Sequence, residues 1–169
     1  DKDADIAIAA RRIAWGKTLN AGQVCIAPDY LLIHRSRENE FVEAFRKELE
    51  ALHGRDIKES KHYVRMVSDA AYQRVIGYMS DGVVRFGGGR DAATRYIEPT
   101  LLDNVSPESR VMQEEIFGPI LPIVEISSME EAETFINNRE KPLALYIFAE
   151  ESKARRLLNH TSSGGACIN

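Results

Sequence analysis

The hydrophobic residues of this chain repeat with a helical period near the N-terminus and again at several later points. The first helix is predicted behind two acidic residues, Asp3 and Asp5, whose carboxylates favour the positive end of a helix. Its apolar stripe consists of Ile6, Ala10, Ile13 and Ala14. This helix leads the chain to a small, polar stretch at residues 20–30.

Three further helices are predicted where apolar residues recur every three or four positions after a serine. Ser36, Ser68 and Ser128 are the predicted N-caps, since a serine hydroxyl can accept a hydrogen bond from the first helical turn. Glu131 follows Ser128 at the spacing of a capping box, and Gly54 ends the stripe that begins after Ser36. A short last helix is expected around residues 154–158.

Compact apolar runs lie between these helices. Such runs are typical of strands that are covered on both faces, as in a parallel sheet. They are residues 30–34, 83–86, 120–126, 143–148 and the closing 166–169. The run at 143–148 is the best candidate for a central strand, and Pro99 gives the extended residues 95–102 an edge or irregular placement. The alternation predicts one α/β domain over residues 1–169, with helices on a largely parallel sheet.

Composition narrows the classes of function. The 169 residues are 44% hydrophobic and 28% charged, with a net charge of −4 and a pI near 5.6. Scattered basic residues on an acidic chain argue against nucleic acid as a partner. The longest apolar run is too short to cross a bilayer and no leader peptide is seen, so we expect a cytoplasmic protein. The chain starts without a methionine, inside a predicted helix, and is expected to be a fragment.

Cys25 is the first candidate for chemistry. It lies where a helix gives way to a loop that contains glycine and proline, a setting that can expose sulfur and direct backbone N–H groups at developing negative charge. The alternative is a small buried apolar side chain, the commoner role of a free cysteine. The other cysteine, Cys167, lies near the far end of the chain, so neither a CxxC pair nor a disulfide framework is present.

Two other patterns are weaker. Residues 87–89 are three glycines after a predicted strand, but they lack the spacing of a dinucleotide fingerprint and the lysine of a P-loop, so a turn is favoured over a phosphate site. The four histidines show no metal-ligand spacing. No metal is therefore expected.

An acidic and aromatic segment at residues 114–119 is more informative. Glu114 and Glu115 precede Phe117 and a Gly-Pro turn, so carboxylates and a ring stand side by side. Carboxylates accept hydrogen bonds from ribose hydroxyls, and an aromatic face can hold a flat heterocycle. A solvated acidic turn with Phe117 anchored in the core would give the same pattern.

Together these stretches resemble the aldehyde dehydrogenase superfamily over essentially the whole chain. NAGQVC at residues 20–25 resembles the cysteine signature, and EEIFGP at residues 114–119 resembles its second hallmark. EPT at 98–100 and SGGACIN at 163–169 fall in family order. The form GQVCIAPDY at residues 22–30 resembles in particular the class 3 or fatty-aldehyde branch.

The resemblance implies a role for each matching residue. Cys25 would attack an aldehyde, pass through a thiohemiacetal and a thioester, and yield a carboxylic acid, with NAD or NADP as oxidant. Glu115 would bind the nicotinamide ribose and Phe117 would pack near the ring, while Asn20 and Gln23 would shape the cysteine loop. The parent enzyme would be a homo-oligomer.

The resemblance also implies that some parts of the enzyme are missing from residues 1–169. An upstream dinucleotide-binding domain, a second oxyanion donor and the deacylating base would lie outside residues 1–169, so the isolated chain is not expected to sustain turnover. Two rival classes stay open at this point. One is a cysteine hydrolase with His160 or His34 as base. The other is a non-catalytic binding domain on a dehydrogenase-like fold.

Overall fold

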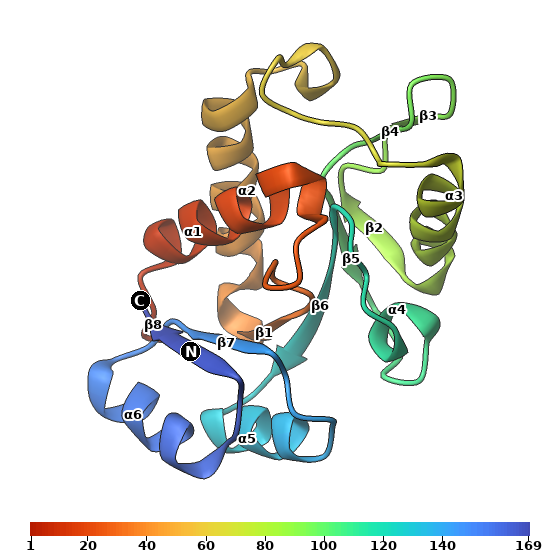
Figure 1. Ribbon diagram of the computed structural model, residues 1–169. Coiled ribbons are helices and arrows are strands. Elements are labelled where there is room, and N and C mark those ends of the chain that lie inside the picture. The colour runs from red at the N-terminus through yellow and green to blue at the C-terminus, as the bar shows by residue number, and fades with distance from the viewer.

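A four-stranded sheet with helices on both faces forms the centre of the protein, as the computed structural model of residues 1–169 shows (Figure 1). The strands lie in the order β1 (Leu31–His34), β6 (Ile120–Ile126), β5 (Thr100–Asp103) and β2 (Val83–Phe86). The β1–β6 and β5–β6 pairs are parallel, whereas β2 pairs antiparallel with β5. The predicted α/β fold with a largely parallel sheet is confirmed, with one antiparallel edge strand in addition.

Neighbouring residues on the central strands point to opposite faces, and each face has its own core. Leu101 and Leu121 belong to the core under α1 (Ile6–Thr18) and α2 (Glu38–His53). Leu102 and Ile120 belong to the core on the other side, under α3 (Asp69–Gly77) and α4 (Arg110–Gln113). Because both faces are covered, β6 reads as a nearly continuous apolar run in the sequence.

Two of the three serine N-caps predicted from the sequence are present in the structure. Ser68 and Ser128 cap α3 and α5 (Met129–Asn137) as predicted, through hydrogen bonds from Ala71 N–H at 3.1 Å and Glu131 N–H at 3.2 Å. The prediction for Ser36 was wrong: a 3-10 turn at Arg35–Arg37 comes first, and α2 begins at Glu38 without a side-chain cap. The chain turns directly after β1, and the backbone N–H of Ser36 donates to Nδ1 of His34 at 3.3 Å.

Residues 143–148 do not form a central strand, and that prediction was wrong. β7 (Ala144–Ile147) pairs only with β8 (Gly165–Ile168), in a separate parallel two-stranded sheet. Its apolar side chains pack against α5 and α6 (Glu151–His160) in a third, smaller core. The hydrophobic run therefore reflects contact with two helices.

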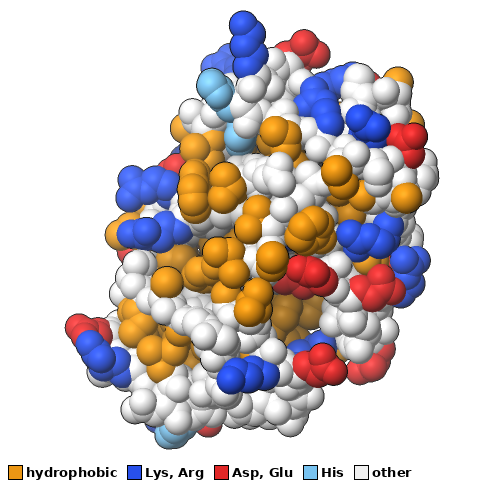
Figure 2. Space-filling model, in the orientation of Figure 1, with side chains coloured by type: hydrophobic (Ala, Val, Ile, Leu, Met, Phe, Trp, Pro, Cys, Tyr) orange, Lys and Arg blue, Asp and Glu red, His pale blue; other side chains and the backbone are white.

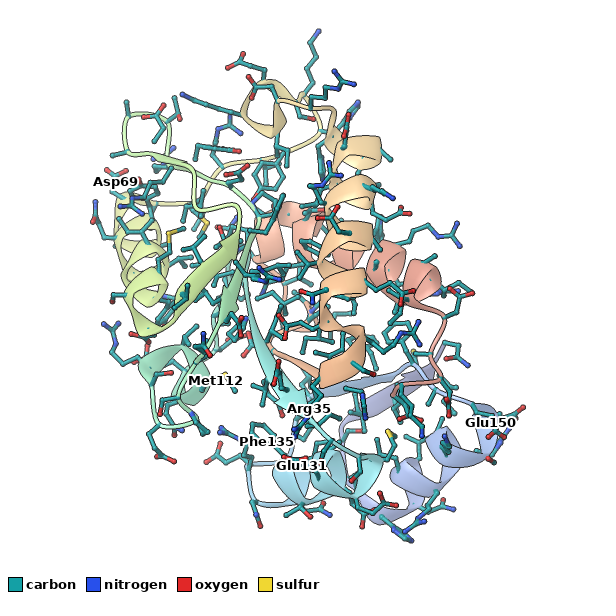
Figure 3. The ribbon with its side chains drawn as sticks, turned by 180° about the vertical axis from the view of Figure 1, so that it is seen from behind. Arg35, Asp69, Met112, Glu131, Phe135 and Glu150 are labelled. Carbon is teal, nitrogen blue, oxygen red and sulfur yellow. The ribbon has the colours of Figure 1, made fainter.

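The residues that flank β1 on both sides contact the α5 helix. The rings of Tyr30 and Phe135 meet edge to face, with centroids 5.6 Å apart. Hydrogen bonds from Ser127 lower the pKa of Glu131, and the positive charge of the nearby Arg35 adds to this shift (Figure 3). These contacts fix the third core relative to the main sheet.

The remaining elements are short. β3 (Arg90–Asp91) and β4 (Tyr96–Ile97) form a small antiparallel hairpin. Pro99 lies between β4 and β5, in the irregular placement that was predicted, although β5 itself is an inner strand and not an edge. Further 3-10 turns span Leu19–Gly22, Ile57–Glu59 and Tyr78–Asp81. No helix has the length and apolar character needed to span a membrane.

A buried carboxyl group lies at the start of α2. Glu38 is 6% exposed and lies close to two other acidic residues, Glu125 and Asp103. The Nε of Arg85 is 3.6 Å from Oε1 of Glu38. Burial, a hydrogen bond with Glu125 and the charge of Asp103 raise the pKa of Glu38 to about 7. The folded protein therefore holds this proton more tightly than the unfolded chain does.

We expect the free energy of unfolding to fall as the pH rises from about 4.5 to about 7, because the raised pKa of Glu38 stabilises the fold fully only below its unfolded value. Glu38→Gln, which mimics the protonated acid, should flatten this decline in urea unfolding measured at several pH values. Glu43→Gln, at an exposed site on the same helix, is the control and should keep the wild-type slope. An unchanged slope in Glu38→Gln would contradict the assignment.

Candidate active site

The cysteine loop, residues 20–30, begins with an unusual backbone turn. Asn20, Ala21 and Gly22 follow one another with φ angles of 51°, 53° and 72°, all in the left-handed region. Such a run reverses the chain directly after α1, and only glycine adopts it without strain. The reversal carries Cys25 to the surface, where its side chain is exposed.

Two amide side chains hold this turn. The Nδ2 of Asn20 donates to the Gln23 carbonyl at 3.2 Å, and the Nε2 of Gln23 donates back to the Asn20 carbonyl at 2.9 Å. Gln23 is buried and also bonds the Arg65 carbonyl at 3.3 Å and the Val67 N–H at 2.9 Å. The loop-shaping role predicted for both residues is confirmed by these bonds, and the anchor to residues 65–67 is an addition.

A tyrosine from a distant strand secures the other side of Cys25. The Oη of Tyr146 on β7 donates to the carbonyl of Ile26 at 2.7 Å, across 120 residues of sequence. Sequence reasoning missed this contact. A tyrosine in an apolar strand gives no local signal of what its hydroxyl will reach.

The glutamate segment, residues 114–119, meets the cysteine loop through backbone atoms. A Cβ placed on Gly22 would lie 2.3 Å from the carbonyl oxygen of Gly118 and 3.0 Å from that of Lys17. No side chain fits in this gap. The two motifs, about ninety residues apart in sequence, are therefore in direct contact because residue 22 is a glycine.

The two adjacent glutamates differ in their surroundings. The Oη of Tyr78 donates to Oε2 of Glu114 at 2.8 Å and accepts a bond from Arg74 at 2.7 Å. Burial and this bond to Glu114 raise the pKa of Tyr78. Both glutamates are exposed, but the carboxylate of Glu115 makes no hydrogen bond or ion pair within the chain, whereas Glu114 also lies 3.7 Å from Nε of Arg110. Glu115 is therefore the glutamate with a free carboxylate.

A groove of about 1200 Å³ brings the candidate residues together. Cys25, Glu114 and Glu115 line it, with walls from the cysteine loop, β1, α5 and β7 that are mostly hydrophobic. Figure 2 shows a hollow with hydrophobic walls and an acidic side chain at its rim. Phe117 is half-buried with φ 45° and does not line the groove.

The rival chemistries find less support in this geometry. No histidine lines the groove: His160 is bonded to Glu133 at 3.1 Å and His34 to Ser36 at 2.8 Å. A Cys-His hydrolase would need an imidazole beside the sulfur. No group of three or more histidine, cysteine or acidic side chains is placed to hold a metal ion.

The glycine run at residues 87–89 forms the connection between β2 and β3. The N–H of Gly88 bonds Thr100 Oγ1 at 3.0 Å, and the N–H of Gly89 bonds Glu98 Oε2 at 2.9 Å. These amides are already occupied within the fold. A phosphate cradle would require them to be free.

Comparison with known proteins agrees with the motifs that meet at this groove. The family model described as "Aldehyde dehydrogenase family" matches residues 1–169. The chain belongs to the aldehyde dehydrogenase family. Its whole length is 52% identical to the dog "Aldehyde dehydrogenase, dimeric NADP-preferring" and 48% identical to "Aldehyde dehydrogenase family 3 member A2" of Pongo abelii. It spans 38% and 35% of the length of these two relatives.

Solved structures of aldehyde dehydrogenases have the same fold. The substrate-bound state of Staphylococcus aureus AldH is similar with a TM-score of 0.96 and 45% identity, over 100% of this chain and 38% of that one. The P. syringae indole-3-acetaldehyde dehydrogenase AldA, in complex with NAD⁺, gives a TM-score of 0.85 and 28% identity, over 98% and 36%. The predicted resemblance to this family is confirmed.

Gly22→Ala should separate the two motifs of this aldehyde dehydrogenase chain. We expect it to lower the free energy of unfolding by about 2–4 kcal/mol, from a strained positive φ and from overlap with Gly118. Gly54→Ala is the matched control, since Gly54 also has a positive φ of 83° but nothing within 4 Å of an added Cβ. It carries backbone strain without an overlap and should therefore cost less than Gly22→Ala, about 1–2 kcal/mol, in the same urea unfolding measurement. Equal losses in both variants would refute the close-contact explanation.

Proposed function

We propose that residues 1–169 form the thiol-bearing catalytic part of an NAD(P)-dependent aldehyde dehydrogenase, which oxidises an aldehyde to a carboxylic acid with Cys25 as nucleophile. One observation carries the proposal. In a chain of this family, the Gly22–Gly118 contact brings an exposed cysteine and a free carboxylate to the walls of one groove. Neither rival class uses both residues.

The work of Cys25 follows from its position. Its sulfur is exposed to the groove, so it can bond to the carbonyl carbon of an aldehyde while the oxygen takes up the electron pair. The backbone N–H of Cys25 donates to no acceptor in the chain and is available to the resulting oxyanion. Covalent capture also fixes the C–H bond of the former aldehyde in one place.

Glu115 and Phe117 are the residues that would hold the nicotinamide end of the cofactor. The carboxylate of Glu115 is free to accept bonds from ribose hydroxyls, whereas that of Glu114 is engaged by Tyr78. Phe117 would have to present its ring from beside the groove. The chemistry that NAD(P)⁺ supplies when bound is acceptance of the hydride from the captured carbon, which leaves a thioester on Cys25 for water to hydrolyse.

The relatives support proposals on the cofactor, the oligomeric state and the parts of the enzyme outside this chain. The dog relative is named dimeric and NADP-preferring, which favours NADP over NAD and a dimeric enzyme. The main dinucleotide-binding domain, a second oxyanion donor and the deacylating base are proposed to lie outside residues 1–169, since this chain covers 38% of that relative. The isolated chain should then react with thiol reagents at Cys25 without sustaining turnover.

Cys25→Ser in the full-length enzyme should abolish NAD(P)H formation from an aldehyde, because an alcohol oxygen is a far weaker nucleophile than a thiolate. Cofactor binding, followed by fluorescence titration, should be nearly unchanged. Cys167→Ser is the matched control at the second exposed cysteine and should keep its activity. Oxidation at the wild-type rate in Cys25→Ser would rule out this residue as the nucleophile.

Glu115→Gln should raise the KM for the cofactor by roughly tenfold, because a hydrogen bond to a charged acceptor is replaced by a weaker one to an amide. Glu114→Gln is the neighbouring control: its oxygen can still accept from Tyr78, so the KM should change by less than about threefold. Steady-state kinetics at saturating aldehyde separate the two. A larger effect at Glu114 would reverse the assignment.

A further inference from the structure

Asp29, in the cysteine loop, reaches across to the glutamate segment. Its Oδ1 accepts a hydrogen bond from the N–H of Ile116 at 3.1 Å, across 87 residues of sequence. This is the one side-chain hydrogen bond that joins the two segments. Ile116 is fully buried and stands between Glu115 and Phe117, so the bond fixes the peptide from which both side chains extend.

Arg74 on α3 binds the backbone on both sides of Ile116 as well. Its Nη1 donates to the carbonyl of Glu115 at 3.1 Å and its Nη2 to the carbonyl of Ile116 at 2.9 Å. The peptide groups on both sides of Ile116 are thus held by side chains from two separate elements. Phe117 follows with φ 45°, a conformation that a bulky residue keeps only when its surroundings impose it.

A buried lysine explains why a carboxylate stands at position 29. Lys17 is 1% exposed and its Nζ has no hydrogen-bond partner in the chain. Burial lowers the pKa of Lys17 to about 8, and the negative charge of Asp29 opposes this shift. Burial likewise raises the pKa of Asp29, opposed first by Lys17 and then by the Ile116 N–H. Each group is the counter-charge of the other in a region poor in water.

We propose that Asp29 is a positioning residue: it fixes the Ile116 peptide to the cysteine loop and so sets where Glu115 and Phe117 stand relative to Cys25. The inference rests on the proposed function, in which these two side chains hold the nicotinamide end of the cofactor. Lys17 is the counter-charge of this carboxylate, and Arg74 holds the same peptide from α3.

The test compares Asp29→Ala with Asp29→Asn in the full-length protein. Three quantities are measured: hydrogen exchange of the Ile116 amide, the dissociation constant for NADP⁺ by fluorescence, and the rate at which iodoacetamide alkylates Cys25. Asp29→Ala should lose protection at Ile116 and bind NADP⁺ about tenfold more weakly, with an alkylation rate within about twofold of wild type. Asp69→Ala, at an aspartate whose side chain is 85% exposed, is the control and should change none of them.

The conservative variant separates positioning from charge. Asp29→Asn keeps an oxygen that can accept from Ile116, so protection and NADP⁺ affinity should stay within about threefold of wild type. Arg74→Met provides an independent variant, should Asp29→Ala not fold: it releases the two carbonyls and should also weaken NADP⁺ binding. Unchanged NADP⁺ affinity in Asp29→Ala and Arg74→Met, or equal losses in Asp29→Ala and Asp29→Asn, would overturn the proposal.

Failure of the proposed function gives a different result. In that case the unaltered protein binds neither NADP⁺ nor NAD⁺. Exchange of the Ile116 amide still reports the positioning role, since it needs no cofactor. Full protection in Asp29→Ala would overturn that role, and lost protection there with retention in Asp29→Asn would support it.

Discussion

The close contact between Gly22 and Gly118 is the constraint on which the rest of the site depends. The chain cannot place Cys25 beside the glutamate segment unless two backbones approach to a distance that excludes any Cβ. Side chains around this contact hold both backbones in place. The strained turn at residues 20–22 is stabilised by Gln23, and the glutamate segment by Arg74 and Asp29.

The anchors of the site come from several layers of the fold. Gln23 connects the cysteine loop to residues 65–67, Tyr146 reaches it from the small β7–β8 sheet, and Arg74 holds the glutamate segment from α3. A loop held from so many sides loses little further entropy when it binds a substrate. Such preorganisation suits the role of nucleophile that we propose for Cys25.

Most of the fold followed from the local pattern of residues. The helices capped by Ser68 and Ser128 and the two-sided strand β6 appear where the sequence predicted them, because caps and hydrophobic periods act over a few residues. The errors arose where distant partners decide. Residues 143–148 have the composition of a central strand, yet their side chains pack on α5 and α6 and their backbone pairs with β8 alone.

The sequence by itself determined the α/β class, the family resemblance and the identity of Cys25, Glu115 and Phe117 as candidates, since these rest on residue types at short spacing. Only the tertiary structure decided that Glu114 is engaged by Tyr78 while Glu115 is free, that Phe117 stands beside the groove, and that Asp29 ties the two motifs together. Hydrogen bonds across 36 and 87 residues leave no trace in a local pattern. They depend on how the layers pack, which no single stretch of sequence encodes.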